Sequence, residues 1–88
     1  MKVNHKDFIK IRNRVIKRLF ALDKWQSNHI LVKNLESGFP KHEMHKVKLV
    51  VNELIKSDFL IAKKSLHGNN VALNPVKKHY IDKIIEAI

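Results

Sequence analysis

The spacing of apolar residues changes at Phe59, and this change constrains the fold more than any other feature of the sequence. Before Phe59 apolar residues recur every three or four positions, a spacing that predicts helices. Over residues 59–73 two short β-prone runs flank the turn cluster His67-Gly68-Asn69-Asn70, which predicts a hairpin. Helical spacing then returns and continues to Ile88. The pattern therefore predicts a mainly α fold that contains one small β-hairpin.

The first predicted helix starts after Asn4 and continues to about Leu22. Asn4 is a good N-cap, and Asp7 adds an acidic side chain to the first turn. Residues at helical spacing form the apolar face: Phe8, Ile11, Val15, Leu19 and Leu22. The other face is polar and mostly basic: Lys10, Arg12, Asn13, Arg14, Lys17 and Arg18. We expect this basic face to be solvated or to contact a nucleic-acid backbone weakly.

The middle of the chain predicts a helix, a tight turn and another helix. Trp25-Gln26-Ser27 is a connector or a brief strand, after which Ser27 or Asn28 caps the first of these helices. That helix turns three apolar residues inward: Ile30, Leu31 and Leu35. Gly38 suits a left-handed residue just past its end, and Pro40 suits the start of the next helix.

The third predicted helix covers about residues 41–57. One stripe of it is apolar: Met44, Val47, Val50, Val51, Leu54 and Ile55. The opposite face carries Lys41, His42, His45, Leu49, Asn52 and Lys56. Asn74 and Pro75 then predict the cap and first turn of a last helix over residues 75–88. The apolar stripe of this last helix is broad: Val76, Tyr80, Ile81, Ile84, Ile85 and Ile88.

The order helix, short strand or connector, helix, helix, hairpin, helix resembles that of winged helix-turn-helix domains. The resemblance is carried by the helix at residues 29–35, the turn Ser37-Gly38-Phe39-Pro40, the third helix and the segment 53–61. That last segment is similar to the Leu-x-x-x-Gly-Leu-Ile exit from recognition helix to wing, found in families that include the multiple-antibiotic-resistance and arsenic-repressor types. Asp58 stands where glycine is commonest, and aspartate can also adopt the left-handed conformation. The resemblance implies a single winged helix-turn-helix domain over residues 1–88.

The net charge of +10, from 18 Lys+Arg against 8 Asp+Glu, indicates a polyanionic partner because such an imbalance costs folding energy through self-repulsion. Nucleic acid is the first choice and an anionic membrane surface the second. No run approaches the ~18 apolar residues of a spanning helix, and the first residues lack the apolar stretch of a signal peptide. We therefore expect a soluble cytoplasmic protein associated with the nucleoid and no membrane partner.

The residue types that usually carry chemistry are missing or dispersed. The sequence contains no cysteine, no phosphate-binding glycine-rich loop, no Gly-x-Ser-x-Gly and no close pair of acidic residues in an apolar setting. We expect neither enzymatic activity nor a cofactor. His42 and His45 could share a helix face, but nothing nearby completes the three or four ligands of a zinc site, so we expect no metal. Trp25 and Tyr80 could stack on single-stranded bases, although packing is the role we expect for both.

The resemblance implies a transcription regulator that binds double-stranded DNA, with the third helix in the major groove and the hairpin as a wing. Asn52 or His45 could hydrogen-bond base edges, and lysines could contact phosphates. Leu49 could touch a thymine methyl group or be an ordinary exposed leucine. The candidate DNA-binding residues are Lys41, His42, His45, Lys46, Lys48, Leu49, Asn52, Lys56, Lys63, Lys64, His67, Asn69 and Asn70.

The last helix predicts a homodimer, because regulators of the resembled families commonly dimerise through terminal helices, and we expect the first and last helices to form the interface. The candidate interface residues are Tyr80, Ile81, Ile84, Ile85 and Ile88. The same stripe could instead pack on the first helix of its own chain. The alternative function is a winged-helix module that binds a protein partner, without DNA binding, through Leu49 and this stripe. A basic amphipathic membrane helix, with Lys77, Lys78 and Lys83 beside the stripe, is a weaker third hypothesis.

Overall fold

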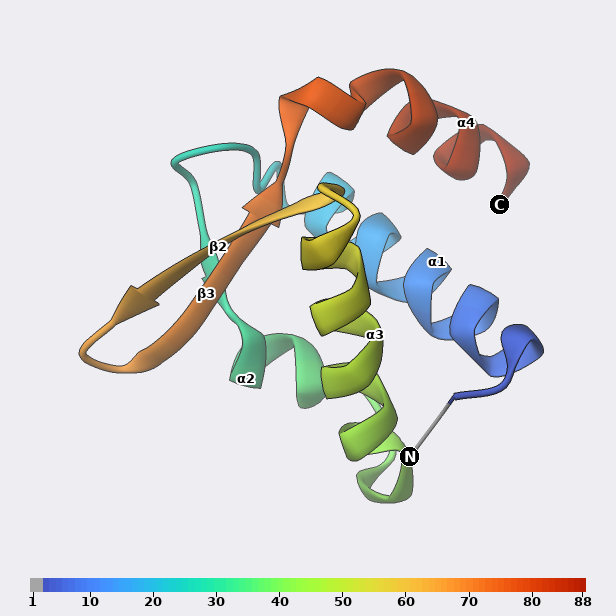
Figure 1. The fold of residues 1–88 in the computed structure, drawn as a ribbon, viewed down its shortest axis with the longest axis vertical. Coiled ribbons are helices and arrows are strands. Elements are labelled where there is room, and N and C mark those ends of the chain that lie inside the picture. Colours follow the sequence, from blue (N-terminus) through green and yellow to red (C-terminus); the bar gives the residue numbers. More distant parts are fainter. Residues whose placement is uncertain (1–2) are drawn as a thin grey trace.

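The computed structural model describes residues 3–88 and contains four helices and one small sheet in that range (Figure 1). The helices are α1 (His5–Ala21), α2 (Val32–Glu36), α3 (Met44–Lys56) and α4 (Lys78–Ala87), and the strands are β1 (Ile30–Leu31), β2 (Leu60–Ser65) and β3 (Gly68–Leu73). Single 3-10 turns precede α3 at Lys41–Glu43 and α4 at Pro75–Lys77. The fold is therefore mixed α/β, and it keeps the predicted order of helices and hairpin.

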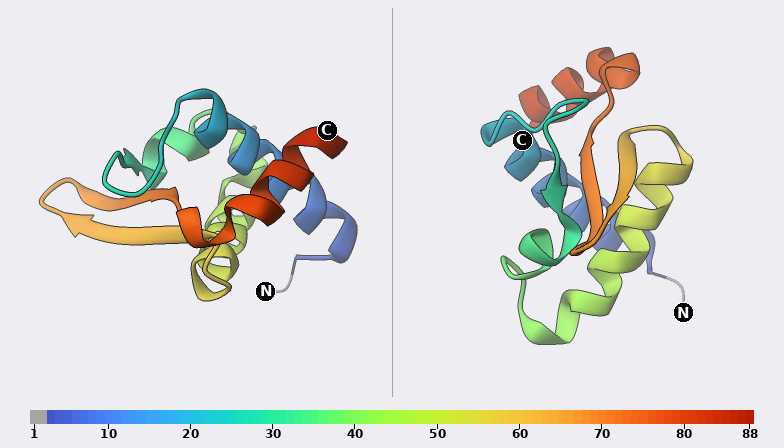
Figure 2. Two further views of the ribbon diagram at one scale, coloured as in Figure 1. Left: turned by 90° about the horizontal axis from the view of Figure 1, so that it is seen from above. Right: turned by 90° about the vertical axis from the view of Figure 1, so that its left-hand side faces the viewer.

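The sheet has three antiparallel strands in the order β1-β3-β2, so a short strand precedes α2, at Ile30–Leu31 and not at Trp25-Gln26-Ser27, where the sequence left a brief strand open. The right-hand view of Figure 2 shows the three strands side by side. Strand β1 adds to the free edge of β3, where Ile30 pairs with Val71 and Leu31 with Asn70. The sequence prediction placed Ile30 and Leu31 inside the second helix, and this was wrong. Pairing with β3 satisfies their backbone groups in an extended conformation, so α2 starts only at Val32.

The start of α2 also differs from the predicted cap. Leu31 is the N-cap residue, and it makes no side-chain capping bond. The Asn28 side chain instead donates to the carbonyl oxygen of Asp23 at 2.9 Å and so closes the preceding loop. The predicted left-handed Gly38 is wrong as well, because the positive φ angles in the described residues are those of Asp23, Gln26, Asp58 and Gly68.

The hairpin turns two residues earlier than the sequence indicated. Ser65 pairs with Gly68, so Leu66 and His67 form the tip and Gly68 begins β3. Gly68 has a φ of 125°, a conformation that L residues rarely adopt, which explains a glycine at this point. The outer part of the hairpin extends away from the helices (Figure 1 and the left-hand view of Figure 2).

The other predicted helices are confirmed with their caps. Asn4 Oδ1 accepts from the Asp7 backbone N–H at 2.8 Å at the start of α1, and Asn74 Oδ1 accepts from the Val76 N–H at 3.1 Å before α4. Pro75 occupies the first turn of that last helical segment, where its missing N–H costs nothing. The third helix is also confirmed, with its first turn in the tighter 3-10 form.

Helices α1 and α3 end in the same way, with an aspartate in the left-handed conformation. After α1, the Asp23 N–H donates to Phe20 and the next N–H donates to Leu19. After α3, the Asp58 N–H donates to Ile55 and the next N–H donates to Leu54. Asp23 and Asp58 have φ angles of 55° and 66°. Both ends are Schellman motifs, in which carbonyls that would otherwise lack donors are satisfied.

The core lies where α1, α3, α4 and the inner ends of the strands meet. Its fully buried side chains come from every predicted apolar stripe: Ile11, Val15, Ile16, Leu19, Leu35, Val47, Val50, Val51, Leu54, Leu60, Val71, Leu73 and Ile81. The apolar stripe predicted for the third helix is confirmed, with Met44 and Ile55 half-buried at its margins. Packing of α3 on both α1 and β2 fixes the direction in which its exposed face points.

Trp25 joins the loop after α1 to the end of the sheet. The Gln26 N–H donates to the carbonyl of Leu73 at 3.0 Å, and the Leu73 N–H donates to the carbonyl of Lys24 at 2.7 Å. The half-buried indole ring packs against the core and meets the ring of Phe20 edge-on at a centroid distance of 6.2 Å. These contacts agree with the packing role expected for Trp25.

Candidate nucleic-acid interface

A groove of about 700 Å³ lies between α2, α3 and the hairpin. Its apolar wall includes Leu31, Val51 and Ile55. Cationic side chains from three elements line it: Lys33 of α2, Lys48 of α3, and Lys63 and Lys64 of β2. Groups that can donate and accept hydrogen bonds are also present, from Asn52, Asn69 and His67. The groove is therefore basic and polar around an apolar wall.

Six of the predicted DNA-binding residues line this groove: Lys48, Asn52, Lys63, Lys64, His67 and Asn69. Two regular elements turn four of them to one side: Lys48 and Asn52 on α3, and Lys64 and Asn69 on the hairpin. Lys48 and Asn52 are four positions apart in α3 and so share a helix face. The hairpin register places Lys64 opposite Asn69 on the strand face that carries Leu60 into the core. Lys63 has the opposite parity and lies on the other face of the strand.

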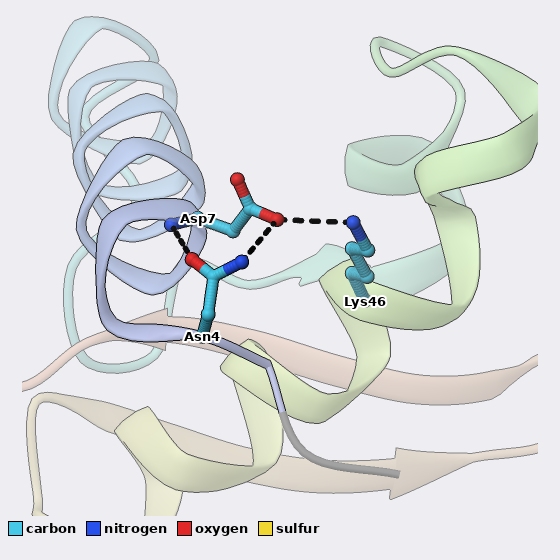
Figure 3. A network of polar contacts seen from close by, with 3 residues as sticks. All are labelled: Asn4, Asp7 and Lys46. Atoms are coloured by element: carbon cyan, nitrogen blue, oxygen red, sulfur yellow. Dashed lines mark hydrogen bonds and ion pairs between the residues drawn. The ribbon is translucent and has the colours of Figure 1, made fainter.

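Lys46 lies in a different environment from the one predicted. Its Nζ contacts Asp7 Oδ2 at 3.0 Å, while Asn4 Nδ2 contacts the same oxygen at 3.2 Å (Figure 3). The hydrogen bond from Lys46 lowers the pKa of Asp7 below its ordinary value, and the positive charge of Lys46 adds to this effect. Lys46 therefore ties α3 to the start of α1, so its charge is already paired within the chain.

The remaining candidates of α3 and of the 3-10 turn before it surround the groove without lining it. Lys41, His42 and His45 are exposed at the amino end of the helix. Lys56 is exposed at the other end, where its Nζ lies 3.7 Å from Glu53 Oε1. Leu49 is half-buried and lines a smaller hollow of about 300 Å³ together with Phe8. It is thus less exposed than its position on a polar face suggested.

Asn70 stabilises the hairpin turn. Its Nδ2 donates to Ser65 Oγ at 2.9 Å and lies 3.4 Å from the carbonyl oxygen of Lys63. These bonds join β3 to β2 across the turn. Asn70 was a candidate for DNA contact, and the structure gives its amide group partners within the hairpin itself.

Lys33 and Glu36 line the groove but were not among the predicted site residues. Both belong to α2, whose five residues are too few for a clear helical pattern in the sequence. One signal was available for Glu36, because it lies four positions after Val32 and thus on the same, inward helix face. The groove consequently contains one carboxylate among its lysines.

The basic face of α1 is partly used within the fold. Arg14 Nη2 donates to the carbonyl oxygen of Gly38 at 2.9 Å, and the Arg14 guanidinium lies 4.4 Å from the centroid of the Phe39 ring. Arg14 therefore holds the turn between α2 and α3. Arg12 bonds to Asn13 beside it, and burial lowers the pKa of Arg12 below its ordinary value. Arg14 is nevertheless exposed, as expected for a solvated face, whereas Arg12 is half-buried.

The predicted dimer residues of α4 divide into two groups. Ile81 is fully buried in the core of its own chain, and Ile84 and Ile85 are half-buried against that core. Tyr80 and Ile88 remain 56% and 51% exposed. The last helix packs on α1, so most of its apolar stripe has a partner within the chain. Tyr80 packs only at the surface, where its ring meets those of Phe59 and His79 edge-on at centroid distances of 6.4 and 5.8 Å and lies 5.2 Å from Lys77 Nζ.

Two further properties concern residues 3–88 as a whole. No three histidine or acidic side chains in this range gather closely enough to hold a metal ion. None of its helices combines the length and the apolar character needed to cross a bilayer.

Comparison with protein-family models, with curated proteins and with solved structures gave no match for the chain.

Proposed function

We propose that this protein binds double-stranded DNA as a winged helix-turn-helix transcription regulator. Helices α2 and α3 form the helix-turn-helix in this proposal, and the β2–β3 hairpin is the wing. One observation carries it: lysines of α2, α3 and β2 meet around a single groove. An even spread of these charges over the surface would instead suit a protein that uses them for solubility.

In the proposed contact some side chains bind phosphates and position the protein, and others contact base edges and recognise the sequence. The major groove is wide enough to admit an α-helix, so the exposed face of α3 enters it with Asn52 near the base edges. One DNA strand then passes between α3 and the hairpin, where Lys48 and Lys64 neutralise its phosphates. His42 and His45 lie at the entering end of the helix, where they can contact bases or phosphates.

Fluorescence anisotropy of a labelled duplex, titrated at several salt concentrations, tests the proposal. Each phosphate neutralised contributes about −0.9 to the slope of log K against log salt. We expect the double variant Lys48→Ala/Lys64→Ala to weaken binding and to make this slope shallower by roughly 1.8. The double variant Lys6→Ala/Lys83→Ala is the matched control, since it also removes two exposed lysines and both lie outside the groove, and it should leave the slope nearly unchanged.

Two outcomes would contradict the proposal. Absence of duplex binding near 100 mM salt would favour the protein-partner module, and an equal loss in the control variant would mean that only total charge matters. Base reading is tested separately with Asn52→Ala on a selected site. That change should cost about 1–3 kcal/mol there and almost nothing on random DNA, provided that Asn52 reads a base.

The proposal includes a homodimer, formed through the part of α4 that the chain leaves exposed. Tyr80 and Ile88 are the predicted interface residues that are available for it. So small an apolar area supports a weak dimer, with a dissociation constant in the micromolar range or above. Sedimentation equilibrium of the wild type and of Tyr80→Ser tests this, and a monomer at all concentrations would remove the dimer from the proposal.

A further inference from the structure

Glu36 is unusual for a charged side chain in so small a fold. It is 5% exposed, and it is the buried charged residue of the described chain. Its carboxylate forms no hydrogen bond or ion pair with the residues that the structure describes, whereas buried glutamates are almost always paired. It also lies in the last turn of α2, where the helix dipole disfavours a negative charge.

The side chain of Glu36 is buried, but its carboxylate oxygens are not fully enclosed. Within residues 3–88 no fully enclosed side-chain nitrogen or oxygen lacks a partner, so the unpaired oxygens of Glu36 must keep contact with the exterior. Glu36 lines the groove between α2, α3 and the hairpin, and the groove provides that opening. A buried acceptor thus lies within reach of a molecule that enters the groove. Such an acceptor favours a ligand that brings hydrogen-bond donors.

The surroundings of Glu36 limit what kind of donor can enter. Lys33, Lys48, Lys63 and Lys64 line the same groove, and they repel an ammonium or guanidinium group. A neutral N–H donor avoids this repulsion, and the ligand gains from carrying an anionic group for the lysines. Leu31, Val51 and Ile55 provide an apolar wall against which a flat ring can pack. The volume of about 700 Å³ lies within the usual range for small-ligand sites.

Among common nucleobases, guanine matches a carboxylate best. Its ring N1–H and its 2-amino group point the same way, so they can donate to the two carboxylate oxygens together. In adenine and cytosine the amino group stands beside an acceptor nitrogen, and in uracil the single N–H stands between two carbonyls. These arrangements place a lone pair near a carboxylate oxygen, which is repulsive.

We propose that the groove binds a free guanine nucleotide, with Glu36 accepting hydrogen bonds from the base and the lysines of the groove binding the phosphate. Duplex DNA cannot supply this ligand, because pairing with cytosine occupies the same edge of guanine. The site goes beyond the proposed DNA contact, and it shares Lys48 and Lys64 with it. Nucleotide and duplex therefore compete, which makes the nucleotide an effector that releases DNA.

Isothermal titration of the wild-type protein with four ligands tests the site directly. Guanosine monophosphate should bind tightest, and inosine monophosphate, which lacks only the 2-amino group, should bind about tenfold or more weakly. Adenosine monophosphate should be weaker again, because its N1 is an acceptor. Guanosine, which lacks the phosphate, should lose affinity and most of the salt dependence. Equal affinities for the guanine and inosine nucleotides would overturn the proposal.

Glu36→Gln tests the role of the carboxylate while keeping the shape of the side chain. It should lower the affinity for guanosine monophosphate about tenfold or more and remove the preference over inosine monophosphate. Glu86→Gln, an exposed glutamate of α4, is the matched control and should change neither. If Glu36→Gln fails to fold by circular dichroism, the wild-type ligand series decides the question.

The two proposals fail in distinguishable ways. If the protein binds duplex DNA but shows no preference for guanine, the nucleotide site is wrong and the DNA proposal stands. If it binds the guanine nucleotide but no duplex, the reverse holds. Where both are right, adding guanosine monophosphate should lower the anisotropy of a bound labelled duplex in the wild type, and this effect should be lost in Glu36→Gln.

Discussion

At the scale of single residues, the two aspartates that end α1 and α3 show how a residue other than glycine can close a helix. Asp23 and Asp58 both have positive φ angles, and both donate their N–H to the helix that they follow. The polar side chain of aspartate makes this conformation less costly than it is for most residues. The departure from glycine at Asp58 therefore leaves the exit from α3 into the hairpin intact.

Substitution of Asp58 should reveal the cost of this conformation. We expect Asp58→Gly to raise the free energy of unfolding by about 0.5 kcal/mol, since relief of the left-handed strain slightly exceeds the entropy that glycine adds to the unfolded chain. Asp58→Val should lower it by about 1–2 kcal/mol. Urea denaturation of the three proteins measures both changes. If valine were tolerated without loss, the strain at this position would be negligible.

The pair of Asp7 and Lys46 predicts a pH dependence of stability. Because the folded-state pKa of Asp7 lies below its ordinary value of 3.8, the pair stabilises the fold above that pH, and the stabilisation is lost as the pH falls below it. Wild type should therefore unfold at higher urea than Asp7→Asn at pH 7, and the difference should shrink as the pH falls below 3.8. A constant difference across this range would show that the charge of Asp7 is not the cause.

A second ion pair, Lys78–Asp82, serves as the control for the pair of Asp7 and Lys46. Lys78 and Asp82 are 2.7 Å apart but belong to the same helix, α4, whereas Asp7 and Lys46 join two helices. Exposed pairs within one helix contribute little to stability. Lys78→Met should thus change the urea midpoint less than Lys46→Met does, although both remove one lysine.

At the scale of elements, the side chains of α4 contribute unequally to its packing on the core. Ile81 is fully buried against the core, and Tyr80 beside it is largely exposed. We expect Ile81→Ala to lower the free energy of unfolding by about 2–5 kcal/mol and Tyr80→Ala by less than about 1 kcal/mol. Thermal unfolding followed by circular dichroism compares them. Equal losses would mean that Tyr80 packs more tightly than its exposure indicates.

The elements that could be predicted from the sequence are those long enough to repeat their own pattern. Helix α3 shows its apolar stripe over thirteen residues, and α1 over seventeen, so both were located correctly. Helix α2 has five residues, and Ile30 and Leu31 before it are apolar whether they are helical or extended. Their pairing with β3 depends on where a distant segment lies in space. No local pattern contains that information.

The same limit applies to the candidate site. Lys48 and Asn52 could be assigned to the exposed face of α3 because the helix period alone places them there. The ion pair of Lys46 could not be predicted, since its partner Asp7 is 39 positions away in the sequence. Glu36 became apparent only once α2, α3 and the hairpin were placed around one groove.

At the scale of the whole molecule, the net charge of +10 must oppose folding, because like charges repel each other across a small protein. The three ion pairs of the described residues offset only part of it. Salt shortens the range of this repulsion, from about 10 Å at 0.1 M to about 3 Å at 1 M.

Salt should therefore act in opposite directions on stability and on the proposed DNA binding. We expect the free energy of unfolding to rise by on the order of 1 kcal/mol between low and high sodium chloride, as repulsion is screened. Over the same range the affinity for a duplex should fall steeply. Urea titrations at fixed salt concentrations measure the first effect. A midpoint that decreases with salt would indicate that attractive charge pairs dominate the fold.

Trp25 gives the molecule a built-in optical reporter. It is the only tryptophan, and the residues on either side of it bond to Leu73 at the far end of the hairpin. The surroundings of its indole are thus complete only when two segments distant in the chain have joined. In a stopped-flow experiment the fluorescence of Trp25 would report the rate at which the loop after α1 and the end of β3 come together. Far-ultraviolet circular dichroism could follow helix formation independently.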